Sequence, residues 1–260
     1  MGFGTHLESK LVNASVAAAP TFQKIGQFAD KVGMGGVTAA ATNAASAVLP
    51  TVRNCVAHVD AENDRFKLWK KTAEDALVLR NEGAPSKELF SWVLAHKNQL
   101  PGGAFECGKN IDGSEWYACR TFRMGGLHVG KSGKMAKDPK TGELVRRPAL
   151  FRIDGSDVEI EDYEVLTINT PEDGNYKNEG VKPQWVPSPS PFKADDRNFI
   201  GKILVPGGSK HDGTVYYVAR AEYFQGTHPS MVNEDMRNVS ITFGGKEIVS
   251  AEVCTLVIFQ

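Results

Sequence analysis

Residues 112–128, DGSEWYACRTFRMGGLH, and residues 212–228, DGTVYYVARAEYFQGTH, repeat one another at an interval of 100 residues. Six positions are identical: Asp112, Gly113, Tyr117, Arg120, Gly126 and His128 recur as Asp212, Gly213, Tyr217, Arg220, Gly226 and His228. An Asp-Gly pair before an alternating run is typical of a tight β-hairpin turn, because glycine tolerates a positive φ. The repetition predicts a tandem duplication of a β-rich unit.

A second block of matches follows at a shorter interval. Glu159, Ile160, Glu164 and Val165 match Glu247, Ile248, Glu252 and Val253, each 88 residues apart. The difference between 100 and 88 predicts 12 extra residues in the first copy, and we assign Lys137–Gly142 to this inserted loop. Neither copy can bury its apolar face alone, so we expect the two to pack as a pseudo-symmetric β-sandwich or barrel.

The first hundred residues have a different character. An apolar stripe (Phe22, Ile25, Phe28 and Val32) recurs at helical spacing, residues 37–52 are small, and residues 60–98 are rich in helix formers. A break at 83–85 separates two predicted helices, the second capped by Ser86. The fold class is therefore α+β: a helical segment over 1–98, then an all-β tandem-repeat module over 99–260. Its repeats span about 99–185 and about 199–260, joined by a stiff connector at 186–191.

Composition narrows the possible functions. The 260 residues carry 30 basic and 31 acidic side chains, which argues against a dedicated nucleic-acid binder. No apolar run is long enough for a transmembrane helix. The N-terminus lacks a secretory signal pattern, which predicts a cytoplasmic protein with leaderless release as an open route. The four cysteines form no CxxC pair. We therefore expect no zinc site, no other metal and no cofactor.

Several short motifs occur in the same order in both copies. They are Gly108–Gly113, Leu127–Lys131 and Asp162–Leu166 in the first, and Gly207–Met231 and Gly244–Glu247 in the second. With these motifs, residues 99–260 resemble the DM-nine repeat family, which includes mannose-specific lectins and lectin-like parts of toxins. The resemblance implies a non-catalytic module that binds mannose-type glycans, with a homodimer as the expected assembly.

The resemblance also implies a sugar site in each copy. The matching positions are Asn110 and Lys131 in the first copy, and Lys210 and Met231 in the second. A thioether cannot donate a hydrogen bond, so the first copy is the better candidate. The full set of predicted ligand-binding residues is Asn110, Asp112, His128, Lys131, Lys210 and His228. For the Asp and His residues, turn formation and packing are the competing interpretations.

Other interpretations of the sequence stay open. The carboxylates Glu159, Glu161, Asp162 and Glu164 would suit glycoside hydrolysis, although strand alternation places them on a solvent face. The residues 22–52 could insert into a membrane after glycan docking, as in a toxin. Alternatively, the chain could be an intracellular interaction scaffold without sugar binding. Cys107 and Cys119 flank the first turn one step out of register, so a disulfide there requires a bulge.

Overall fold

The computed structural model describes residues 60–83, 88–153, 155–168, 182–234, 236–244 and 246–259. Nearly all of them belong to one compact unit, residues 65–260, which is the subject below. The apolar stripe at residues 22–32 and the small-residue stretch at 37–52 lie outside the described residues.

A helix over residues 60–81 precedes a series of antiparallel strands. In the first half these are β1 (Phe90–His96), β2 (Glu106–Lys109), β3 (Glu115–Arg123), β4 (Gly126–Ser132), β5 (Met135–Lys137), β6 (Leu144–Arg146), β7 (Ala149–Ile153), β8 (Ser156–Ile160) and β9 (Asp162–Ile168). The second half has β10 (Lys182–Pro187), a 3-10 turn η2 (Arg197–Phe199), β11 (Ile203–Leu204), β12 (Pro206–Ser209), β13 (Val215–Tyr223), β14 (Gly226–Val232), β15 (Val239–Phe243), β16 (Lys246–Ser250) and β17 (Val253–Phe259).

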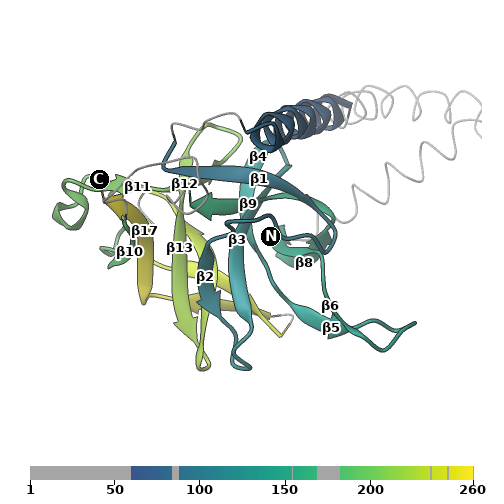
Figure 1. Cartoon of the computed structure of the whole chain (residues 1–260). Helices are drawn as coiled ribbons and strands as arrows, with labels where there is room; N and C mark the ends of the chain where they lie inside the picture. The colour runs from purple at the N-terminus through teal and green to yellow at the C-terminus, as the bar shows by residue number, and fades with distance from the viewer. Residues whose placement is uncertain are drawn as a thin grey trace, which may run out of the picture. The chain divides into compact units, whose positions relative to one another are not determined.

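The main sheet has the strand order β1-β9-β3-β4-β12-β13-β17-β10. Its first four strands come from the first half of the module and its last four from the second half, which lie on opposite sides of the sheet (Figure 1). Strands β4 and β12 are neighbours at the centre of this order. The predicted fold class, a helix followed by an antiparallel, two-repeat β module, is therefore confirmed. Within the described residues this sheet is open, so of the two predicted architectures the closed barrel is not formed.

The interval of 88 residues predicted for the second block is wrong. Arg120 of β3 pairs with Glu164 of β9, whereas the equivalent Arg220 of β13 pairs with Cys254 of β17. The closing strands therefore correspond at an interval of 90. A shift of two residues keeps every side chain on the same face of a strand, so the alternating pattern could not distinguish the two alignments. The insertion in the first repeat is 10 residues, and the lengthened connection between β4 and β7 forms the β5–β6 hairpin, which projects from the module (Figure 1).

The helix predicted to begin at Ser86 is also wrong, because residues 90–96 form β1 and pair with β9. A seven-residue apolar run does not distinguish a buried strand from a buried helix. Similarly, the first two residues of the predicted connector, Val186 and Pro187, end β10.

Strands β1 and β10 are equivalent: the Arg120 guanidinium lies 4.7 Å from the Trp92 ring centroid, and that of Arg220 lies 4.5 Å from Trp185.

The two repeats share a core and interlock through their backbones. Buried residues at equivalent positions meet in one cluster, among them Ala118 with Val218 and Leu166 with Leu256. A Cβ atom on Gly108 of β2 would lie 2.0 Å from the carbonyl oxygen of Thr227 in β14. Reciprocally, a Cβ atom on Gly208 of β12 would lie 2.2 Å from the carbonyl oxygen of Leu127 in β4. Each repeat therefore presses a glycine against the other's hairpin.

The helix is held against the first repeat by polar contacts. Trp69 donates its indole N–H to Glu164 Oε2 at 3.0 Å, and Lys70 Nζ lies 2.9 Å from Asp162 Oδ2. Glu164 is buried and also accepts from Arg120 Nε at 2.7 Å. Two carboxylates of β9, Glu164 and Asp162, thus join the helix to the sheet.

The two cysteines near the first turn are free thiols. Cys119 packs with Tyr117 in the core of the first repeat, whereas Cys107 packs with Ala118 in the cluster between the repeats. Because neighbouring residues of β3 point to opposite faces, the two thiols lie on opposite sides of the sheet. The bulge between Glu106 and Gly108 does not bring them into a disulfide.

Candidate functional site

A cavity of about 220 Å³ lies across the boundary between the two repeats. Most of its wall consists of equivalent residues taken from both copies: Val129 with Pro229, Gly130 with Ser230, Lys131 with Met231, Leu150 with Ser240, and Arg152 with Thr242. The cavity therefore occupies the position of pseudo-two-fold symmetry. The predicted first-copy lysine and its second-copy counterpart, Lys131 and Met231, line the same cavity and not two separate ones.

Lys131 is the buried cation of this cavity, with 5% of its surface exposed. Its ammonium group donates to the carbonyl oxygen of Thr242 at 2.5 Å and lies 3.4 Å from His228 Nδ1. The same nitrogen lies 4.5 Å from the centroid of the Trp116 ring. Burial lowers the pKa of Lys131 from 10.5 to about 8. At neutral pH the group is therefore still mostly protonated, and one of its three N–H groups has no hydrogen-bond acceptor among the described residues.

Two buried rings stand beside the ammonium group. His228 is fully buried, and burial together with the adjacent Lys131 lowers its pKa to about 4, so the imidazole is neutral at pH 7. A neutral imidazole can accept a hydrogen bond at Nδ1 from the ammonium. Trp116 is 5% exposed, and its indole N–H meets no acceptor among the described residues. Buried polar groups almost always have partners, so this indole N–H is an exception; Trp116 packs on Lys131 but does not itself line the cavity.

An ion-pair network borders the same cavity. Arg152 donates to Asp157 Oδ1 at 2.7 Å and lies 3.5 Å from Glu247 Oε2, and the Thr242 hydroxyl lies 3.3 Å from the same Asp157 oxygen. Within the described part of the chain, Arg152 Nε is buried without a hydrogen-bond partner. The cavity thus combines spare N–H donors with a rim carboxylate, Glu247, and with apolar walls. This combination suits a small polyhydroxy ligand with one C–H face.

The structure brings together two of the six predicted site residues, Lys131 and His228. Asn110 and Lys210 lie at the starts of two equivalent hairpin turns, where each backbone N–H donates to the carbonyl oxygen four residues later. Asp112 follows Asn110 in its turn. Hydrogen bonds from the Ser114 side chain and backbone lower the pKa of Asp112, so this carboxylate closes the turn.

His128 occupies the position equivalent to His228, but its surroundings differ. Its Nε2 lies 3.0 Å from the carbonyl oxygen of Arg123, and the residue is half-buried. Of the six predicted residues, Lys131 is the one that lines the cavity. The turn nevertheless approaches the site, because a Cβ atom on Gly226 would lie 2.9 Å from Lys109 O and 3.0 Å from His228 Nε2.

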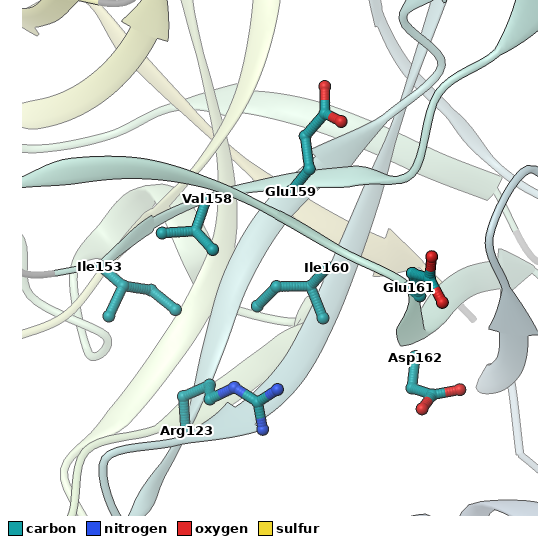
Figure 2. Close-up of a pocket in the computed structure, with 7 residues that line it drawn as sticks. All are labelled: Arg123, Ile153, Val158, Glu159, Ile160, Glu161 and Asp162. Carbon is teal, nitrogen blue, oxygen red and sulfur yellow. The ribbon is translucent and has the colours of Figure 1, made fainter. Parts of the chain in front are cut away.

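A second, more open cavity of about 400 Å³ lies on the first repeat, at the acidic run considered for glycoside hydrolysis. Figure 2 shows Ile153, Val158 and Ile160 between Arg123 on one side and the carboxylates on the other. Glu159 is paired with Arg147 at 2.7 Å. Burial acts to raise the pKa of Asp162, but hydrogen bonds from Lys70 and His96 outweigh it and leave the pKa lowered. Asp162 therefore stays ionised and cannot serve as a general acid at neutral pH.

Arg152 and Thr242 of the cavity lining were not predicted from the sequence, and neither was Trp116, whose ring packs on Lys131. Trp116 could have been singled out, because a tryptophan that alternates with small residues on a strand next to the predicted site is a natural wall for a sugar. Arg152 and Thr242 carry no such signal. They reach the cavity because β7 and β15 occupy equivalent positions, and this equivalence requires the 90-residue interval.

The described residues hold no group of three or more His, Cys, Asp or Glu side chains positioned to bind a metal ion. Among the same residues, no helix has the length and apolarity to cross a membrane.

Comparison with known proteins shows what the chain is similar to. The DM9 repeat matches residues 132–250, which confirms the resemblance seen in the sequence. No curated protein matches the chain. Among solved structures, the crystal structure of the nematode sperm cell motility protein MFP2B is similar, with 17% identity and a TM-score of 0.46. The match covers 68% of this chain and 50% of that one, so the chain spans about half the length of that relative.

Proposed function

We propose that this chain, whose residues 132–250 match the DM9 repeat of a lectin-like family, binds carbohydrate without transforming it. We place the sugar in the inter-repeat cavity. The observation that carries the proposal is the buried Lys131 ammonium in the cavity lining, together with Arg152 of the same lining, whose buried Nε has no hydrogen-bond partner among the described residues. Mannose-type glycans are the proposed ligand class.

The geometry supports one site for each chain. Lys131 Nζ and Arg152 Nε supply donors to sugar hydroxyls, and Glu247 at the rim supplies an acceptor. Charge-assisted hydrogen bonds of this kind are about twice as strong as neutral ones. We expect a small cavity of this type to bind weakly, with a Kd in the millimolar range. A millimolar Kd corresponds to a binding free energy of about 4 kcal/mol. We therefore propose a homodimer as the functional assembly, since two linked sites raise the avidity.

The test is a glycan array followed by calorimetry with the full chain. We expect binding to mannose-rich glycans, and a loss of at least tenfold in Lys131→Met, because a hydrogen bond to a charged group contributes about 1.5–3 kcal/mol. Lys140→Met is the matched control, since Lys140 lies in the exposed β5–β6 turn.

If the wild-type chain binds no glycan on the array, carbohydrate binding is refuted. The alternative that the chain is an interaction scaffold without sugar binding would then be favoured. Equal binding by wild type and Lys131→Met would refute the assignment of the site. The membrane-active alternative rests on residues 22–52, outside the described residues, and stays a prediction.

A further inference from the structure

The inter-repeat cavity is chemically unequal although its walls are related by symmetry. Where the first repeat contributes the Lys131 ammonium, the second contributes the Met231 thioether, and Met236 adds another thioether to the lining. Both methionines are partly exposed, as expected of side chains that face an open cavity. Leu150 and Ile241 extend the apolar lining.

A sugar with hydroxyl groups on every side would be poorly matched to this cavity. Hydroxyls near Lys131 and Arg152 would find donors. A hydroxyl turned toward the two thioethers would lose its water and gain no comparable hydrogen bond, because a thioether is a weak acceptor and no donor. The methionines instead favour an alkyl group, since unbranched, polarisable side chains adapt to apolar ligands of irregular shape.

We infer that the cavity selects a sugar bearing an apolar substituent, such as an O-alkyl group or the first carbons of an aglycone, directed at Met231 and Met236. This inference rests on the proposed carbohydrate site and specifies its ligand. The polar face of the sugar binds at Lys131 and Arg152, while the substituent fills the space at the thioethers. Each methylene buried there should tighten binding about fourfold.

The experiment compares methyl and n-propyl α-D-mannopyranoside by calorimetry with the full chain. The propyl glycoside has two more methylenes, so we expect it to bind about sixteenfold more tightly. Met231→Gln replaces the thioether by a polar side chain of similar length and should remove this preference. Met231→Leu, which stays apolar, should retain it. Thermal unfolding monitored by circular dichroism shows that each variant is folded.

The outcomes separate this inference from the proposed function. If wild type binds both glycosides equally, the selection for an apolar substituent is wrong while carbohydrate binding stands. If the preference survives in Met231→Gln as strongly as in Met231→Leu, the substituent does not lie at the thioether and the inference is likewise overturned. If neither glycoside binds at any concentration up to tens of millimolar, the proposed function fails and this inference fails with it.

Discussion

Replacing Lys131 by Met is expected to stabilise the protein while it removes sugar binding. Burial lowers the pKa of Lys131 from 10.5 to about 8. At about 1.4 kcal/mol for each pKa unit, keeping the ammonium charged inside the fold costs about 3 kcal/mol relative to water. Methionine has nearly the same length and carries no charge, and it already occupies the equivalent position 231.

Two losses offset part of this gain. The carbonyl oxygen of Thr242 loses the donor at 2.5 Å, which costs about 1 kcal/mol. The cation–π contact with Trp116 is also lost, at about another 1 kcal/mol. The net stabilisation is then about 1 kcal/mol at pH 7, which for a unit of this size raises the Tm by roughly 2–4 °C.

The assay is thermal unfolding of wild type and Lys131→Met followed by circular dichroism, paired with calorimetric titration of a mannoside. The reasoning requires opposite changes in the two measurements: a higher Tm and a weaker affinity. A Tm lowered by several degrees with unchanged affinity would show that the ammonium holds the repeats together and does not serve a ligand.

Three further predictions concern pH, packing and the helix. Burial and a nearby ammonium lower the pKa of His228 to about 4, so unfolding takes up a proton between pH 4 and 6.5 and stability falls as the pH falls through that range. Urea titrations at pH 7 and pH 5 should differ by about 1–2 kcal/mol, and His228→Gln should flatten the difference. Gly108→Ala and Gly208→Ala each place a Cβ atom against a carbonyl oxygen of the other repeat. Each should lower the free energy of unfolding by about 2–3 kcal/mol in the same titration. Gly102→Ala is the control, because a Cβ atom there meets no neighbour, and it should leave the stability almost unchanged. Glu164→Ala leaves the arginine and the tryptophan that it binds without an acceptor and should cost about 3 kcal/mol, and an unchanged urea midpoint would show that this carboxylate does not hold the helix.

The duplication could be predicted from the sequence because the Asp-Gly turns and the strands that follow them keep the same spacing in both copies. Lys137–Gly142 was correctly assigned to an insertion, since turn-forming residues there have no counterpart in the second copy. The alignment at Glu164 failed because a two-residue shift preserves the alternation on which it relied. β1 was missed because its apolar run carries no period that separates strand from helix.

The candidate site was less accessible to sequence reasoning. Lys131 was predicted as a ligand donor, and its partner His228 was named for its repetition alone. The meeting of Lys131 with Met231 in one cavity could not be predicted, because it depends on how the two repeats face each other. That arrangement is decided by β2 and β12 packing on the opposite repeats, and these contacts leave no mark on the local residue pattern.

The reciprocal packing of the two glycines on the opposite hairpins has a consequence for what the module can become. Two separate, identical chains that packed in this way would place the same residue on both sides of the two-fold axis. Their pocket would then offer identical groups to both sides of a ligand. Joining the halves into one polypeptide removes that restriction. The residues on each side can then change independently while the packing of the strands stays symmetric. This is how an ammonium group and a thioether come to occupy equivalent positions in one pocket.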